Sequence, residues 1–172
     1  MTVRLSKGVR QGVFGFTLVE AMFAVVASAV FVGACLTSIV FNRVASMKAK
    51  EQAIAMDFLI HYVETVKALP FAELQPGAPI NSLYDGSDGS PRITIPADRS
   101  WISLETDDFE TFHPDLAWFK GRNPQMQVAL NTTSSGGSAH TRHLKVRIAW
   151  DSPLERGGRT ESHLDLVKYR DL

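Results

Sequence analysis

The stretch GVFGFTLVEAMFAVV, residues 12–26, begins an apolar segment that contains a single carboxylate, Glu20. No other acidic side chain occurs before residue 43, and residues 21–41 carry no charge at all. An α-helix needs roughly 20 apolar residues to cross a bilayer, so the sequence predicts one membrane-spanning helix here. An acid within such a helix is costly, which means that Glu20 needs an explanation.

The composition fits one domain plus an additional segment, because 45% of the 172 residues are hydrophobic and 21% are charged. The first fifteen residues contain Arg4, Lys7 and Arg10 and no acid. Removing these three from the 18 bases leaves 15 against 18 acids, which argues against sequence-independent binding of nucleic acid. Cys35 is the only cysteine, so no intramolecular disulfide can form.

Two general interpretations of the apolar segment leave Glu20 unexplained. In a secretory signal peptide cleaved near residues 27–29, Glu20 would interrupt the apolar core, and the product would begin with the still apolar residues 30–41. A plain signal anchor fits the length of the segment but gives the acid no role. Basic residues flank both ends of the segment, so the charge bias does not set its orientation.

A third interpretation takes the residues together. Gly15, the aromatic Phe16 and, four residues further on, Glu20 precede an uninterrupted apolar run, and a short basic leader precedes them all. This pattern resembles the class III signal of type IV pilins and of type II secretion pseudopilins. The resemblance covers about residues 8–70, and the rest of the chain matches only in general architecture.

The resemblance implies that a prepilin peptidase cleaves between Gly15 and Phe16 and methylates the new amine of Phe16. A glycine before the cut leaves the backbone accessible to an enclosed active site. The resemblance also implies that Glu20 pairs with the N-terminal amine of an adjacent subunit, so that its charge is relieved only in the correct axial register. A helix-start acid with no further role is the simpler alternative for Glu20.

The expected protein is therefore a single-pass protein of the bacterial inner membrane, with its leader in the cytoplasm and its C-terminal head in the periplasm, or at the cell surface if it belongs to a pilus. Its expected partners are prepilin peptidase, other pilin or pseudopilin subunits and the inner-membrane assembly platform. Residues 1–69 lack the helix proline of many major pilins, and only Gly33 interrupts the apolar run. This difference favours a minor subunit.

Other functions remain as alternatives: a major pilin, or a membrane-anchored binding module for DNA, a secreted substrate or a surface. The sequence lacks the phosphate-binding glycine loops, the HExxH zinc helix and the GxSxG nucleophile turn. We therefore expect no enzymatic activity and no cofactor.

The predicted fold is α+β and pilin-like: a long N-terminal helix packed on a small antiparallel sheet of three to four strands. It is divided into a cleaved leader (1–15), a transmembrane and assembly half of the helix (16–41), an amphipathic half (42–69), a variable αβ connection (70–122) and the sheet (123–172). The helix should end near Leu69, before Pro70. The apolar stripe of its second half comprises Ile54, Phe58, Tyr62, Val66 and Leu69.

Alternating apolar residues predict strands at 126–130, 144–150 and 162–169, joined by links at 131–142 and 151–160. The connection is expected to be irregular, with two short strand candidates at 92–95 and 101–106.

Candidate ligand-binding residues are few. His140, His143 and His163 suggest a metal site, but if Trp150 lies opposite Glu161, then His143 and His163 are roughly 17 Å apart. The acidic residues of 103–115 and the glycine loop 85–90 are better explained as solvated loops than as calcium sites. Five aromatic residues are expected to serve packing rather than a binding platform: Trp101, Phe109, Phe112, Trp118 and Phe119.

Overall fold

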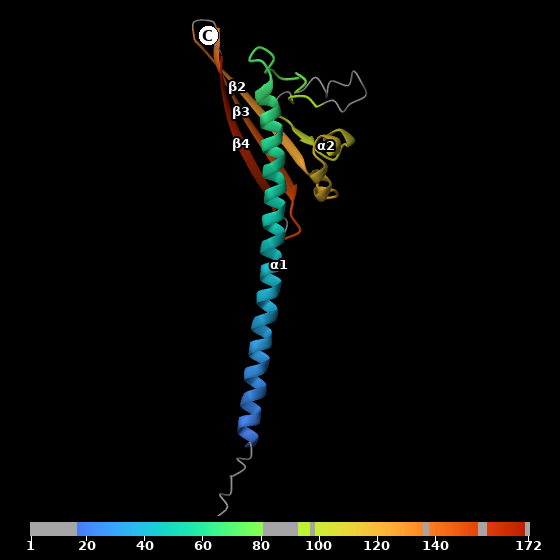
Figure 1. Ribbon diagram of the computed structural model, residues 1–172, viewed down its shortest axis with the longest axis vertical. Coiled ribbons are helices and arrows are strands. Elements are labelled where there is room, and N and C mark those ends of the chain that lie inside the picture. The colour runs from blue at the N-terminus through green and yellow to red at the C-terminus, as the bar shows by residue number, and fades with distance from the viewer. Residues whose placement is uncertain (1–16, 81–92, 97–98, 136–137, 155–157, 171–172) are drawn as a thin grey trace, which may run out of the picture. The chain divides into compact units, whose positions relative to one another are not determined.

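The computed structural model describes residues 17–80, 93–96, 99–135, 138–154 and 158–170 (Figure 1). The chain forms two compact units, Met1–Arg43 and Val44–Leu172. One helix, α1, contributes to both. The described elements are α1 (Leu18–Ala68), β1 (Trp101–Ser103), α2 (Asp107–Phe112), the 3-10 helix η2 (Pro114–Phe119), β2 (Gln125–Ser135), β3 (Ser138–Asp151) and β4 (Arg159–Tyr169).

In the first unit, the described residues form the apolar half of α1. The helix continues through Gly33, where the Thr37 hydroxyl donates a hydrogen bond of 2.9 Å to the Gly33 carbonyl. A Cβ placed on Gly33 would meet nothing within 4 Å. Since proline is absent from this half, all of it can keep regular helical hydrogen bonding.

In the second unit, the C-terminal half of α1 lies across a four-stranded antiparallel sheet with the strand order β1-β2-β3-β4 (Figure 1). This arrangement confirms the predicted α+β fold class. Of the predicted stripe, Phe58, Tyr62 and Val66 are fully buried, and Leu69 is nearly so. Ile54 is partly buried against the same core. The amphipathic pattern therefore identified the surface of the helix that packs against the sheet.

The strand register sorts the side chains into an inner and an outer face. Val146 pairs with Val128 on one side and with Leu164 on the other, and this row faces the core. Because side chains alternate along a strand, the neighbouring row of Lys145 and Asp165 faces away from α1, and the two form an ion pair at 3.8 Å. The alternation seen in the sequence thus placed the inner face correctly.

The sheet also holds the C-terminal end of α1. The Lys168 ammonium on β4 donates hydrogen bonds to the carbonyls of Lys67 (2.8 Å) and Leu69, and the Arg142 guanidinium on β3 donates to the carbonyls of Phe71 (2.6 Å) and Leu74. Carbonyls at a helix end lack partners within the helix, and a cation also suits the negative end of the helix dipole. The predicted end at Leu69 is correct to within one residue, whereas the predicted start at Phe16 lies outside the described residues.

The predicted links between strands are too long. β2 continues to Ser135 and β3 begins at Ser138, so most of the predicted link 131–142 is strand, with a register shift between Thr133 and Ser134. The link predicted at 151–160 is also shorter, because β3 ends at Asp151 and β4 begins at Arg159. The strands run past the edge of the core, where no side chain needs to be apolar and the alternating pattern vanishes.

The connection is more regular than predicted. β1 ends at Ser103 rather than residue 106, because the Thr106 hydroxyl accepts a hydrogen bond from the Phe109 N–H and caps α2. The acids Asp107 and Asp108 in the first turn suit the positive end of that helix. In the other strand candidate, Thr94 forms only an isolated bridge with Pro79, and residue 92 lies outside the described part.

Candidate functional site

The N-terminal end of α1 is closed by a reciprocal pair of side chains, Thr17 and Glu20. The Thr17 hydroxyl accepts a hydrogen bond of 3.2 Å from the Glu20 backbone N–H. In return, one carboxylate oxygen of Glu20 accepts bonds from the Thr17 backbone N–H (3.1 Å) and the Thr17 hydroxyl (3.0 Å). This is a capping box, which satisfies two of the N–H groups that a helix leaves unpaired at its start.

The capping box fixes the carboxylate of Glu20 at the first turn of the helix. Gly15 and Phe16, the predicted cleavage and methylation residues, lie outside the described residues. Our sequence analysis did not find the cap, although its signal is present: Thr17-Leu18-Val19-Glu20 has the spacing of a capping box ahead of an apolar run. Helix capping is thus one role of Glu20 within its own chain.

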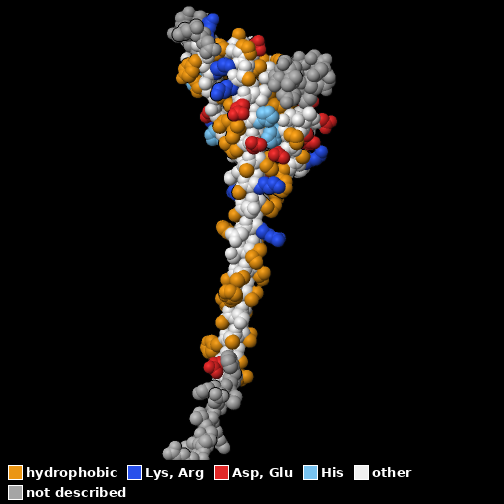
Figure 2. Space-filling model, viewed as in Figure 1, with side chains coloured by type: hydrophobic (Ala, Val, Ile, Leu, Met, Phe, Trp, Pro, Cys, Tyr) orange, Lys and Arg blue, Asp and Glu red, His pale blue; other side chains and the backbone are white. Residues whose placement is uncertain are grey.

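The surface of α1 after this cap is apolar on every side. Figure 2 shows hydrophobic side chains along the first half of the helix, and the large ones among them are half or more exposed. By length and composition, α1 can cross a membrane. The exposed large side chains of this half are Leu18, Val19, Met22, Phe23, Val25, Val26, Val30, Phe31, Val32, Leu36, Ile39, Val40 and Phe41. A helix that is hydrophobic all round requires an apolar environment, either lipid or other helices.

The structure also reveals a buried carboxylate, Glu51, which is 1% exposed where α1 meets the sheet. Its two oxygens accept hydrogen bonds from three side chains: Arg122 at 2.6 Å, Ser152 at 2.8 Å and the indole N–H of Trp150 at 3.2 Å. The Arg122 backbone carbonyl also accepts from the Asp151 N–H. One carboxylate therefore joins α1, the turn before β2 and the end of β3.

Sequence reasoning did not predict the role of Glu51. The predicted stripe begins at Ile54. The buried face of α1 also includes Ala55 and begins earlier, at Glu51, about one turn before the predicted stripe. An acid at a position that continues an apolar stripe is the signal that could have found it. Its partners are 71, 99 and 101 residues away in the chain, so no local pattern names them.

The histidine residues do not form a metal site among the described residues. The last hairpin is shifted by one residue from the register that we considered, because Ala149 rather than Trp150 lies opposite Glu161. His163 faces Arg147, four residues along β3 from His143, or roughly 14 Å at the rise of an antiparallel strand. The side chain of His140 lies outside the described part.

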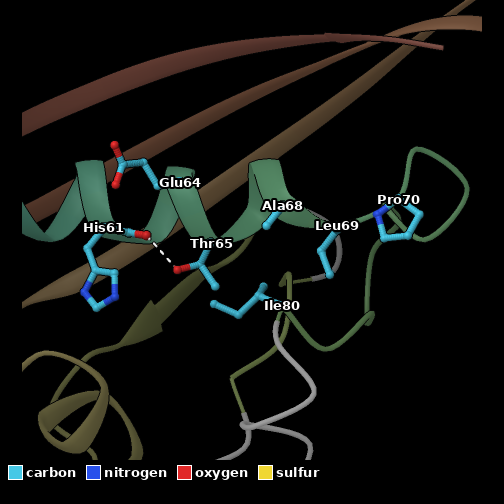
Figure 3. A pocket seen from close by; sticks show the side chains of 7 residues that line it. All are labelled: His61, Glu64, Thr65, Ala68, Leu69, Pro70 and Ile80. Carbon is cyan, nitrogen blue, oxygen red and sulfur yellow. Dashed lines mark hydrogen bonds between the residues drawn. The ribbon is translucent and has the colours of Figure 1, made fainter. Parts of the chain in front are cut away.

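A shallow pocket of about 430 Å³ lies at the C-terminal end of α1 (Figure 3). Its lining consists of His61, Glu64, Thr65, Ala68, Leu69, Pro70 and Ile80. The Thr65 hydroxyl is bonded to the His61 carbonyl of its own helix at 2.8 Å. The His61 ring stacks on Phe112, with 4.4 Å between ring centroids. The polar groups of His61 and Thr65 are thus engaged within α1 and with α2, and the described lining has no set of converging polar groups that could orient a ligand.

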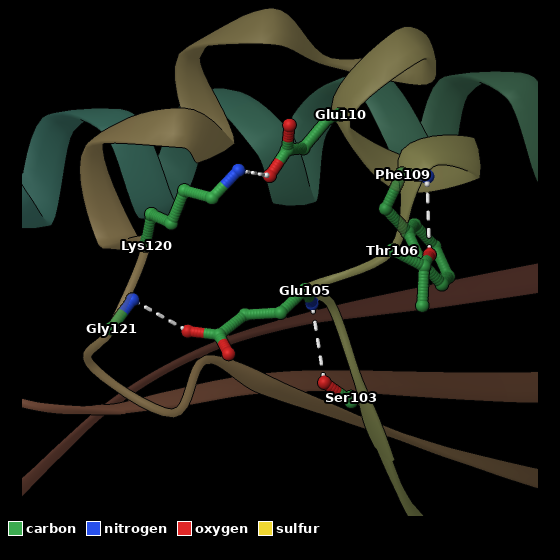
Figure 4. Close-up of polar contacts among 7 residues, drawn as sticks. All are labelled: Ser103, Glu105, Thr106, Phe109, Glu110, Lys120 and Gly121. Atoms are coloured by element: carbon green, nitrogen blue, oxygen red, sulfur yellow. Dashed lines mark hydrogen bonds and ion pairs between the residues drawn. The ribbon is translucent and has the colours of Figure 1, made fainter.

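The acidic stretch 103–115 is solvated as predicted, since four of its five acids are exposed, but residues 107–112 form α2 rather than a loop. The glycine loop 85–90 lies outside the described residues. Glu105 accepts a hydrogen bond of 2.7 Å from the Gly121 N–H, and Glu110 pairs with Lys120 at 3.4 Å (Figure 4). These contacts connect the beginning of α2 to the turn after η2. Glu105 and Glu110 thus have structural partners, and the residues that the structure describes contain no cluster for calcium.

Aromatic packing was predicted correctly for four of the five residues, since Phe109, Phe112 and Phe119 are buried in the core and Trp118 packs against it. Trp118 is partly buried, with the Lys50 ammonium 3.7 Å from its ring centroid. Trp101 is 36% exposed, and the Arg159 guanidinium lies 5.0 Å from its ring centroid. Each of these two tryptophan rings therefore also contacts a cation.

Comparison of the chain with protein-family models, with curated proteins and with solved structures finds no match.

Proposed function

We propose that this chain is a minor subunit of a type IV pilus or of the related type II secretion pseudopilus. The subunit is made as a precursor, cleaved by prepilin peptidase after Gly15, methylated at Phe16 and assembled into a filament through α1. Before assembly it is held in the bacterial inner membrane by the apolar half of the helix, with the second unit in the periplasm.

One observation supports the proposal most strongly: α1 carries two different surfaces along one continuous helix. Its first half is apolar all round and exposed, and its second half buries a stripe against an antiparallel sheet. A protein that moves from lipid into a bundle of helices from other subunits needs such a first half, because both surroundings are apolar. The capped Glu20 at its start gives that half one fixed polar feature.

Glu20 has two separable roles in this proposal. Within its own chain it caps the helix together with Thr17. In the filament, its charge is neutralised by the N-terminal amine of a neighbouring subunit, and only one axial register brings the two groups together. Because a neutral amide at the same position can still cap a helix, the two roles respond differently to substitution.

The experiment compares Glu20→Gln, which keeps the cap and removes the charge, with Thr17→Ala, which weakens the cap and keeps the charge. Both variants should be cleaved like the wild type. Recovery in sheared filaments should be lost for Glu20→Gln and largely kept for Thr17→Ala. The reverse order, or normal recovery of Glu20→Gln, would show that capping is the only role of Glu20.

The proposed processing is tested by N-terminal sequencing and mass spectrometry of the mature protein. The proposal requires a chain that begins with N-methylated Phe16. A chain that keeps Met1, or one that begins at Val30, would refute the assignment to this class. The number of copies in sheared filaments, relative to the main subunit, tests whether the protein is a minor component.

A further inference from the structure

Three bases follow the apolar half of α1, and the first acid after them, Glu51, is buried and paired with Arg122. Residues 21–50 contain Arg43, Lys48 and Lys50 and not one carboxylate. We call these three residues the basic collar. Figure 2 shows Lys and Arg side chains on α1 just past its hydrophobic side chains, with no acidic side chain between them on the face in view. Arg43 and Lys50 are exposed, and Lys48 is half-buried.

We propose that the basic collar binds the headgroups of anionic phospholipids at the membrane surface. This inference rests on the proposed membrane span. At 1.5 Å per residue, Arg43 lies roughly 3 Å and Lys50 roughly 14 Å beyond Phe41 along the helix. The polar region of each leaflet is roughly 5–7 Å thick, so Arg43 falls within it, and lysine side chains just beyond it are long enough to extend toward it.

The surroundings of Lys50 resemble a membrane–water interface. Its ammonium lies 3.7 Å from the ring centroid of Trp118, and the Arg122 guanidinium carbon lies 5.4 Å from the same centroid. The Trp118 indole N–H is buried and finds no partner among the described residues. Lys120, two residues after Trp118, pairs with Glu110 at 3.4 Å and has a side chain that is 74% exposed. Tryptophan and lysine are common together at the headgroup level, where rings and cations both find partners.

Lipid phosphate fits the basic collar better than nucleic acid. The collar has only three bases, and a protein that grips nucleic acid through phosphates usually uses more of them along a groove. The collar also begins where the apolar stretch ends, so the lipid surface is the nearest source of negative charge. Each base near an anionic surface strengthens binding roughly fivefold at low salt.

The test uses the full chain reconstituted in phosphatidylcholine vesicles that contain a dansyl-labelled lipid, either phosphatidylglycerol or phosphatidylcholine. All three tryptophans, Trp101, Trp118 and Trp150, lie in the second unit, so energy transfer to dansyl reports the lipid around that unit. Wild-type transfer should be greater to labelled phosphatidylglycerol. The excess should fall at least roughly fivefold in Lys48→Gln/Lys50→Gln, and it should vanish for the wild type at about 1 M salt.

The control is Lys145→Gln, which removes a base from the outer face of the sheet and should leave the excess unchanged. Equal transfer to the two lipids by the wild type, or an excess that survives in the double variant, would overturn the inference. A DNA duplex that abolishes the excess at physiological salt would also overturn it, in favour of nucleic acid. Carbonate extraction distinguishes a failure of this inference from a failure of the proposed function. If carbonate releases the wild type from the vesicles, the chain does not span the membrane, and the proposed function is wrong.

Discussion

Replacing Glu51 with alanine tests whether one buried carboxylate holds α1 on the sheet. The side chain is 1% exposed and accepts hydrogen bonds from Arg122, Trp150 and Ser152. Removing one partner of a buried ion pair costs about 3–5 kcal/mol, because the other charge is left without compensation. Arg122 is 22% exposed, so water can reach it in part, and we expect a loss at the lower end, about 3 kcal/mol.

For a unit of this size, that loss corresponds to a fall in Tm of roughly 10–15 °C. The measurement is thermal and urea unfolding of the full chain in detergent, followed by tryptophan emission. Because all three tryptophans lie in the second unit, the signal reports the unfolding of that unit alone. The matched control is Glu64→Ala on the exposed surface of the same helix, which should change stability by at most about 0.5 kcal/mol.

A second variant separates charge from hydrogen bonding. Glu51→Gln keeps acceptors for Trp150 and Ser152 but leaves Arg122 without a counter-charge. Adding Arg122→Met to Glu51→Gln should therefore recover part of the loss, and a double-mutant cycle measures the coupling. A loss of unfolding free energy below about 1 kcal/mol for Glu51→Ala, with no coupling between positions 51 and 122, would refute the reasoning. Removing one partner of a buried ion pair should destabilise the fold by more than this.

Two further predictions concern the same unit. Burial raises the pKa of the Tyr62 hydroxyl, so stability should be insensitive to this group below the unfolded pKa of about 10 and should fall as the pH rises above it. Tyr62→Phe should remove this loss of stability at alkaline pH, whereas Tyr169→Phe, which changes an exposed tyrosine, should leave it. Equal unfolding curves for the wild type and Tyr62→Phe at alkaline pH would contradict this prediction. Lys168→Met removes the hydrogen bonds to the Lys67 and Leu69 carbonyls and should lower the free energy of unfolding in urea by about 1–2 kcal/mol. The control Lys145→Met should lower it by at most about 1 kcal/mol, because it removes only a weak surface ion pair. Equal losses for the two lysines would show that the bonds at the helix end contribute nothing.

Periodicity in the sequence predicted the elements that bury apolar side chains. The stripe through Phe58 and Tyr62 gave the packed surface of α1, and the alternation around Val128 and Val146 gave the inner face of the sheet. Periodicity did not predict strand segments that bury no apolar side chains. The outer ends of β2 and β3 carry polar residues such as Thr132, and their hydrogen-bonded ladder leaves no apolar pattern to detect.

Capping and charge were harder to predict, for two different reasons. The cap formed by Thr17 and Glu20 is local, and the spacing of the two residues indicates it, but Glu20 was interpreted through its charge alone. The burial of Glu51 is not local, because it depends on Arg122 and Ser152, which only the folded chain brings near. A charged residue in an apolar stripe therefore predicts distant partners without naming them.

β4 is the last strand of the sheet, and no described strand pairs with its outer edge. Arg159, Glu161, His163 and Asp165 alternate along its exposed side. Charged side chains of this kind discourage a foreign strand from adding to an open edge. The outer edge of β4 is therefore protected against pairing with a strand of another molecule, which limits aggregation through this side of the sheet.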